Sequence, residues 1–161
     1  MRTTPLWFSP SFLNETDILL RGCLESILNT EFDDSSRSLA NLPIRVGGLG
    51  IRRISDICLP AFLASTCGVF NFVKSQIHSH GDEIAICHVS EAFQQWSTIT
   101  SYPDPPPNTE HQKSWDQINV SRIHSILSAS LDSTTDQARF KAIQRREACS
   151  WLHALPSSHI G

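Results

Sequence analysis

Apolar residues in the first part of the chain recur at the spacing of an α-helix. Residues 11–29 carry one apolar stripe, while Asp17, Arg21 and Glu25 lie on the other face at i,i+4 spacing, where they can pair in solvent. This pattern predicts an amphipathic helix over this range. The stripe consists of Leu13, Leu20, Leu24, Ile27 and Leu28.

A short helix is predicted next. Asp33 or Asp34 can cap its N-terminus, because a carboxylate accepts hydrogen bonds from the first backbone amides of a helix. The helix runs to Ala40, since Leu42-Pro43 then ends it.

A long apolar helix follows. Ser55 or Asp56 can cap it, and its apolar positions extend over residues 58–73. Proline is tolerated only in the first turns of a helix, which allows the regular helix to begin at Pro60. Residues 57–73 carry no charge, near the lower length limit of a membrane span, but their helical spacing favours a buried core helix, and we expect no membrane contact.

Three more helices are predicted in the second half of the chain. Asp82 opens a helix that stops before Tyr102-Pro-Asp-Pro-Pro-Pro107, a breaker that should run as extended polyproline II. An apolar pattern over residues 115–127 marks a fifth helix. Ser133-x-x-Asp136 resembles a capping box and opens a sixth, which ends near Leu155-Pro156.

Together these patterns predict an all-α fold, a bundle of about six helices with one glycine-rich hairpin or turn. The proline-rich stretch is the best boundary in the chain. We therefore expect a helical region over 1–101, a linker over 102–108, and a second helical region over 109–161 that is truncated at its C-terminus.

The most distinctive stretch is Leu42-Pro-Ile-Arg-Val-Gly-Gly-Leu-Gly-Ile51. Apolar residues alternate on both sides of Gly47-Gly48, which predicts a tight β-hairpin or an extended glycine turn. A ligand can approach the glycine backbone closely, and three arginines flank it, namely Arg45, Arg52 and Arg53. This cluster can therefore bind phosphates. The alternative is a solvated turn with no ligand.

A second basic cluster lies within the last predicted helix, over residues 139–146. Arg139 and Arg146 are seven positions apart, so they align on one face and can form a phosphate-facing stripe. An ordinary polar face explains the same pattern equally well. The cluster consists of Arg139, Lys141, Arg145 and Arg146.

The charge and cysteine content limit the class of protein. The formal net charge of the 161 residues is -3, so any contact with nucleic acid must be local rather than driven by an overall basic charge. The five cysteines are odd in number and show no paired spacing. This usage is typical of a reducing compartment, and we expect an intracellular protein, in the nucleus or cytoplasm, that is not secreted.

No catalytic, metal or cofactor site is expected. Phe32-Asp33-Asp34 superficially resembles a polymerase turn, but it has no flanking strands and fits a helix cap better. The glycine string lacks the Gly-Lys-Ser/Thr of a phosphate-binding loop. His78-x-His80 with Cys87-His88 matches no familiar zinc spacing, so we interpret it as a solvated loop.

Four strings resemble a known family, namely the region that follows the catalytic palm in non-LTR (LINE-type) retrotransposon reverse transcriptases. The glycine string of residues 42–51 is the most specific of them. The others agree in order and spacing, while residues 76–137 match nothing familiar. They are Arg21-Gly-Cys-Leu-Glu-x-Ile-Leu-Asn29, Leu59-Pro-Ala-Phe-Leu-Ala-Ser65 and Ala148-Cys-Ser-Trp-Leu-His-Ala-Leu-Pro-Ser157.

The resemblance implies a thumb and linker region that packs on the palm domain of a parent polyprotein and helps to hold an RNA or DNA template–primer. Fingers and palm are missing, so the chain is expected not to polymerise DNA by itself. The residues expected to contact nucleic acid are Arg45, Gly47, Gly48, Arg52, Arg53, Arg139 and Arg146. The competing interpretation is a small helical scaffold or protein-interaction domain that binds no nucleic acid.

Overall fold

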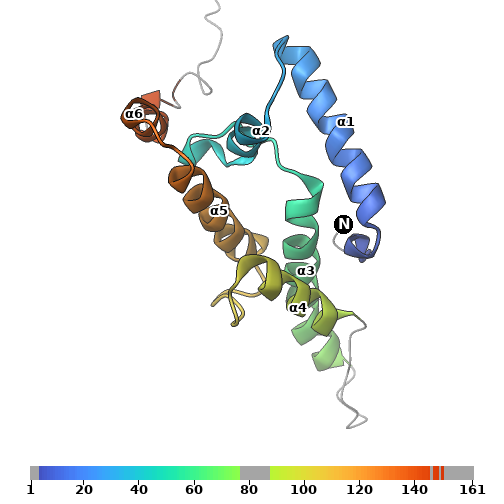
Figure 1. The fold of residues 1–161 in the computed structure, drawn as a ribbon. Helices are drawn as coiled ribbons and strands as arrows, with labels where there is room; N and C mark the ends of the chain where they lie inside the picture. Colours follow the sequence, from blue (N-terminus) through green and yellow to red (C-terminus); the bar gives the residue numbers. More distant parts are fainter. Residues whose placement is uncertain (1–3, 77–87, 146, 149, 151–161) are drawn as a thin grey trace, which may run out of the picture. The chain divides into compact units, whose positions relative to one another are not determined.

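The computed structural model describes residues 4–76, 88–145, 147, 148 and 150. These residues form six α-helices and two short 3-10 helices, with no strand among them (Figure 1). The predicted all-α class and the number of helices are therefore confirmed. Of the two forms predicted for the glycine string, the turn is found and the hairpin is not, because residues Ile44–Val46 form the 3-10 helix η2 instead of a strand.

The chain divides into two compact units. Unit 1 comprises Met1–Glu31 and Arg53–Arg122, and unit 2 comprises Phe32–Arg52 and Ile123–Gly161. Each unit is thus built from two separate stretches of sequence, and helix α5 (Gln112–Ala129) contributes residues to both. This division by contacts differs from the division at the proline-rich stretch, which stays a prediction.

Helix α1 (Pro10–Leu28) has the predicted extent, preceded by the 3-10 helix η1 (Leu6–Phe8). Proline suits its first position because the missing N–H has no helical partner there. The helix ends at Asn29, which adopts the left-handed conformation and donates its N–H to the Glu25 carbonyl.

The predicted apolar stripe of α1 is only partly buried. Leu13 and Leu24 are buried, whereas Ile27 is 79 % exposed and Leu28 is 46 % exposed. Among the residues described, the helix packs mainly on α3 and η1.

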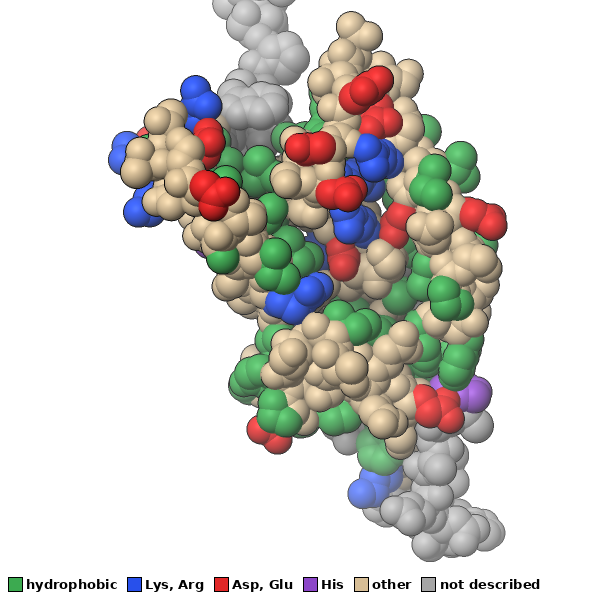
Figure 2. Space-filling view, in the orientation of Figure 1, with side chains coloured by type: hydrophobic (Ala, Val, Ile, Leu, Met, Phe, Trp, Pro, Cys, Tyr) green, Lys and Arg blue, Asp and Glu red, His purple; other side chains and the backbone are tan. Residues whose placement is uncertain are grey.

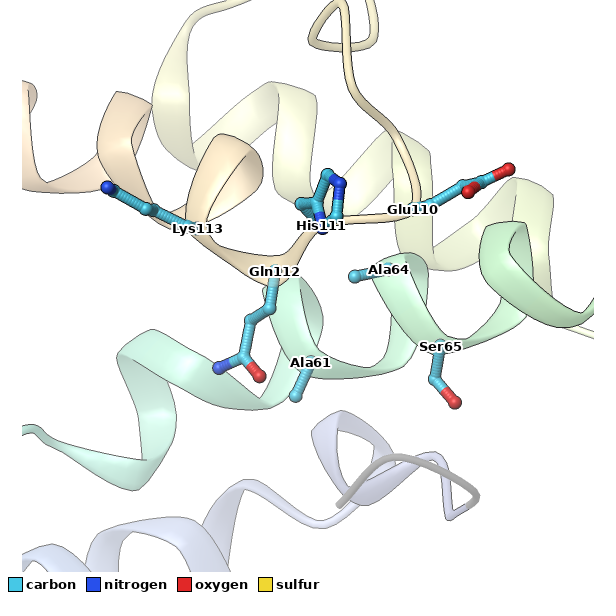
Figure 3. A pocket seen from close by; sticks show the side chains of 7 residues that line it. All are labelled: Ala61, Ala64, Ser65, Glu110, His111, Gln112 and Lys113. Atoms are coloured by element: carbon cyan, nitrogen blue, oxygen red, sulfur yellow. The ribbon is translucent and has the colours of Figure 1, made fainter.

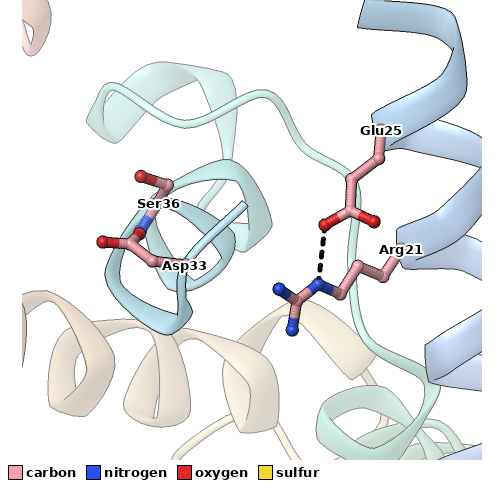
Figure 4. A network of polar contacts seen from close by, with 4 residues as sticks. All are labelled: Arg21, Glu25, Asp33 and Ser36. Atoms are coloured by element: carbon pink, nitrogen blue, oxygen red, sulfur yellow. Dashed lines mark hydrogen bonds and ion pairs between the residues drawn. The ribbon is translucent and has the colours of Figure 1, made fainter. Parts of the chain in front are cut away.

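Two of the charged residues of α1 pair as predicted, and the third does not. Arg21 Nε donates to Glu25 Oε1 at 2.8 Å (Figure 4). Asp17 instead accepts from the backbone N–H of Ile54 at 2.6 Å and of Ser55 at 3.2 Å, and from the Ser55 hydroxyl at 2.6 Å. A carboxylate from α1 therefore caps the N-terminus of α3.

Helix α3 (Ile54–Gln76) consequently begins six residues before Pro60. A proline inside a helix leaves the carbonyl four residues earlier without its amide donor, here that of Asp56. The side-chain amide of buried Asn119 lies 3.5 Å from this carbonyl oxygen. Arg122 holds Asn119 in place by donating to its Oδ1 from Nε at 3.2 Å and from Nη2 at 2.9 Å.

The first half of α3 forms the centre of unit 1. Residues 58–64 are all buried, and α3 packs against α1, α4 (Val89–Thr100) and η1. By length and composition α3 is also the one helix, among the residues described, that is able to cross a membrane, although core helices pass the same test. Its exposed second half carries Val69 and Phe72, which are 49 % and 66 % exposed.

Aromatic rings fill the core around α3. Trp7 contacts Phe62 with ring centroids 4.3 Å apart, and Trp96 contacts Trp115 at 4.8 Å, both edge to face. The proline-rich stretch joins this core, since Pro106 is buried and the Trp115 indole donates to the Thr109 carbonyl at 2.8 Å. Part of this stretch is therefore packed on unit 1, and its extended polyproline II backbone stays a prediction.

The remaining predicted helix boundaries can be compared with the structure where it describes the residues concerned. Asp82, the predicted start of the fourth helix, lies outside the described residues, and α4 is described from Val89. Helix α6 (Thr134–Ile143) begins after Ser133 as predicted, with the Ser133 hydroxyl accepting from the Thr135 N–H. Its predicted end near Leu155-Pro156 is wrong, because the helix ends at Ile143 with Gln144 as its C-cap.

We expect Asp17→Ala to lower the free energy of unfolding by about 1–2 kcal/mol, the usual cost of losing a helix cap. Three donors at the start of α3 lose their acceptor in this variant. Urea denaturation followed by circular dichroism measures the change. Glu15→Ala, an exposed acid on the same helix, is the control and should change stability by less than about 0.5 kcal/mol. Equal effects of the two substitutions would contradict the cap.

Candidate nucleic-acid interface

The candidate interface starts from helix α2 (Asp34–Asn41) in unit 2. Asp33 caps it as predicted, because its Oδ1 accepts from the Ser36 N–H at 2.7 Å (Figure 4). The helix ends at Leu42, where the backbone becomes extended before Pro43. The predicted helix cap at Asp33 is therefore confirmed.

The glycine turn that follows uses its backbone amides internally. The N–H groups of residues 46–48 donate to the carbonyls of Pro43 and Ile44, at 3.0 to 3.2 Å. Those of residues 49–51 donate to the carbonyls of Ala40 and Leu42, at 2.9 to 3.2 Å. The first three bonds close the turn on itself and the last three hold it against the end of α2, so none of the six donors points outward as in a phosphate-binding loop.

The two central glycines are required by this packing. Gly47 has φ +89, and a Cβ there would lie 2.8 Å from Cγ1 of Ile143. A Cβ on Gly48 would lie 1.9 Å from the Leu42 carbonyl oxygen and 2.7 Å from that of Leu39. Packing within the turn therefore explains why both positions are glycine. Their contact with nucleic acid stays a prediction. Because the amides of the turn are bonded internally, we expect the arginine side chains to make any contact with phosphates.

The three arginines near the turn differ in how exposed their side chains are and in the unit to which they belong. Arg45 lies on η2 and is exposed, whereas Arg52 and Arg53 are half-buried. Arg52 ends the first stretch of unit 2, and Arg53 begins the second stretch of unit 1. Of the three, Arg45 is therefore the side chain best placed to meet a ligand.

Helix α6 carries Arg139 and Lys141 of the second basic cluster, and Arg145 follows the C-cap of the helix, so the prediction of one helix over the whole cluster is wrong. Arg139 is 76 % exposed and forms an ion pair with Asp136 at 3.2 Å, and Lys141 and Arg145 are also exposed. The side chain of Arg146 lies outside the described residues. Figure 2 shows Lys and Arg side chains gathered over α6 with acidic groups beside them. The buried face of α6 is anchored by Phe140, whose ring lies 5.1 Å from that of His124.

One contact joins the two basic segments. Gly47 lies against Ile143 at the C-terminal end of α6. Arg45 precedes Gly47 by two residues, and Arg145 follows Ile143 by two. Along the chain Arg145 is closer to this contact than Arg139, which precedes Ile143 by four residues, and helical spacing alone did not single it out. Only the contact between Gly47 and Ile143 draws attention to Arg145.

Positive charge is concentrated in unit 2. Counted over the sequence, unit 2 holds seven Lys and Arg against five Asp and Glu, a net charge of +2. Unit 1 holds six Lys and Arg against eleven Asp and Glu, a net charge of -5. The overall charge of -3 therefore conceals a basic unit that carries both clusters.

The described residues offer little else that carries chemistry. A cavity of about 290 Å³ lies between α3 and the start of α5, but Figure 3 shows Glu110 and Lys113 pointing in opposite directions, so its polar groups do not converge. Among these residues no group of three His, Cys, Asp or Glu could hold a metal ion. Of the predicted metal-like stretch only His88 is described, and its Nδ1 bonds Glu91 at 2.8 Å.

Comparison of the chain with protein-family models, curated proteins and solved structures found no match. The resemblance to reverse transcriptases therefore stays a prediction. It is carried by the residues of the strings themselves, above all residues 42–51.

We expect Gly48→Ala to destabilise the protein by about 3 kcal/mol, the cost of forcing an atom into a filled space. The added methyl group would overlap the Leu42 carbonyl oxygen, which is backbone and has no room to move aside. Circular dichroism during urea denaturation measures the loss.

Gly68→Ala is the matched control on α3. A Cβ there would meet only Glu110, at 3.9 Å, which is ordinary contact. Alanine is the better helix former, so this variant should be as stable as the parent or more stable by up to about 1 kcal/mol. A Gly48→Ala protein of parental stability would contradict the packing of the turn.

Proposed function

We propose that the chain is a non-catalytic segment of a LINE-type reverse transcriptase polyprotein, from the thumb and linker downstream of the palm. In this proposal unit 2 contacts the phosphates of an RNA or DNA template–primer duplex. The order and spacing of the four strings support the origin. The Gly47–Ile143 contact supports the binding, because it joins Arg45 to the end of α6 that precedes Arg145.

The binding would be electrostatic and independent of base sequence. Guanidinium groups donate to phosphate oxygens in a planar, two-point geometry, which makes arginine the suited residue type. The turn itself has its amides bonded internally, so affinity comes from side chains alone. Phosphates would approach unit 2, of net charge +2, and avoid unit 1, of net charge -5. Contacts of this kind give a Kd of roughly 10⁻⁴–10⁻⁶ M.

A helical scaffold without nucleic-acid binding is the second candidate. The internal bonding of the six turn amides favours it, because the glycines then need no ligand to explain them. The two functions differ in one measurable respect, which is whether removing exposed arginines of unit 2 changes binding to a duplex.

We expect the variant Arg45→Ala/Arg145→Ala to bind a template–primer duplex more weakly, with a smaller dependence on salt. Each neutralised phosphate contributes about -0.9 to the slope of log K against log salt, so losing two contacts should flatten the slope by about 2. Fluorescence anisotropy over a salt series measures both quantities.

The matched control removes the same charge from unit 1 with Lys74→Ala/Lys113→Ala, both exposed residues. This variant should keep the parental slope, because unit 1 repels phosphates. Equal effects of the two double variants would contradict binding by unit 2. A parent protein that binds no duplex at about 50 mM salt would favour the scaffold.

We further expect the purified chain to incorporate no nucleotide when supplied with template–primer, dNTPs and Mg²⁺ or Mn²⁺. Polymerisation needs carboxylates that hold two metal ions at the reacting phosphate, and Asp33 instead caps α2. A primer-extension gel measures this, with an intact reverse transcriptase as positive control. Template-dependent extension that copurifies with the chain would contradict the proposal.

A further inference from the structure

Arg139 and Asp136 lie on the face of α6 that supports the glycine turn. Ile143, which contacts Gly47, follows Arg139 by four residues and Asp136 by seven. Residues at these intervals share one face of an α-helix, and each turn rises about 5.4 Å. Arg139 is therefore about one helical turn, and Asp136 about two, from the residue on which the glycine turn rests. All of these residues belong to unit 2.

A single bond joins the two charged side chains. Nη1 of Arg139 donates to Oδ1 of Asp136 at 3.2 Å, with the arginine side chain 76 % exposed and the aspartate side chain 49 % exposed. Among the residues described, Asp136 is the only acceptor that Arg139 has. A guanidinium carries five N–H donors in one plane, so this bond leaves four that can reach a second acceptor. Asp136 thus neutralises the charge of Arg139 while using one of its donors.

The carboxylate of Asp136 and a phosphate compete for the same group. Carboxylate and phosphate oxygens accept from a guanidinium in the same planar geometry. Asp136 lies in the first turn of α6, where the helix dipole favours a negative charge, so the carboxylate is stabilised there without a ligand. A phosphate that approaches Arg139 therefore meets an ion pair, and it must take the place of the carboxylate.

This exchange is energetically small. An ion pair between exposed side chains shifts an equilibrium by a factor of up to about five, because water screens the charges and both side chains lose freedom. A duplex presents many phosphates, so the one that meets Arg139 is held there by the contacts proposed for Arg45 and Arg145. The carboxylate therefore weakens the binding of a duplex without preventing it.

We propose that Asp136 is an intramolecular competitor of the duplex phosphate, which holds Arg139 in the free protein and releases it when unit 2 binds a template–primer. The inference rests on the proposed function and names a residue that sets its affinity. Arg139 then makes a third phosphate contact beside those of Arg45 and Arg145. Asp136 acts through Arg139 and does not touch the ligand, so it is a positioning residue.

A double-mutant cycle on the whole chain tests the proposal, with duplex affinity and its salt dependence measured by fluorescence anisotropy. Asp136→Asn should tighten binding about two- to fivefold, because Arg139 then has no charged competitor. In an Arg139→Ala protein the same substitution should lose this gain. Arg139→Ala should also flatten the slope of log K against log salt by about 0.9, through the loss of one phosphate contact.

The matched control is Asp132→Asn, which removes the same charge from an exposed acid just before α6. This variant measures how far the affinity rises from the change in net charge alone. The gain from Asp136→Asn should exceed that value only while Arg139 is present. Asp136→Glu restores a carboxylate to the first turn of α6 and should return the affinity toward that of the parent. Circular dichroism spectra like that of the parent would show that the variants fold.

The outcomes separate this inference from the proposed function. Equal gains from Asp136→Asn and Asp132→Asn, in a parent that binds the duplex, would overturn the inference alone. So would a gain from Asp136→Asn that persists undiminished without Arg139. A parent that binds no duplex at about 50 mM salt would instead overturn the proposed function, and this inference with it.

Discussion

The candidate interface depends on one close approach between two backbone segments. At position 48 there is room for a hydrogen atom and no more, because a Cβ would lie 1.9 Å from the Leu42 carbonyl oxygen. This approach lets the turn bond back to the end of α2 and lets Gly47 rest on Ile143. The position of Arg45 relative to α6 follows from these contacts. Only glycine permits this close approach of the backbone, and the arginines beside it supply the positive charge.

Local sequence signals predicted the helices well and their connections poorly. Period and capping residues located α1, α2 and α6, including the cap at Asp33. The alternation of Ile44 and Val46 indicated a strand, yet one turn of 3-10 helix produces the same alternation over three residues. The i,i+4 spacing gave Asp17 a partner on its own helix. Its true partner is 37 positions away and leaves no trace in local spacing.

The interface was predicted in its parts but not in its assembly. The flanking arginines of the glycine string were evident from the sequence, and Arg45 is the exposed one. The proposed role of Arg145 was not, because the contact that brings the end of α6 to the turn joins residues 47 and 143. The difference in net charge between the two units was not evident from the sequence for the same reason. Each unit combines two distant stretches, so no contiguous window shows a basic unit beside an acidic one.

The cap that Asp17 provides also constrains the order of folding. Its bond to Ile54 closes a loop of chain that contains the whole stretch Phe32–Arg52. Closing such a loop costs entropy before the contact returns any stability. The middle of α3 can form through local turns, whereas its first turn gains its acceptor only once α1 has docked. We therefore expect the amides at the start of α3 to exchange with solvent sooner than those deeper in the same helix.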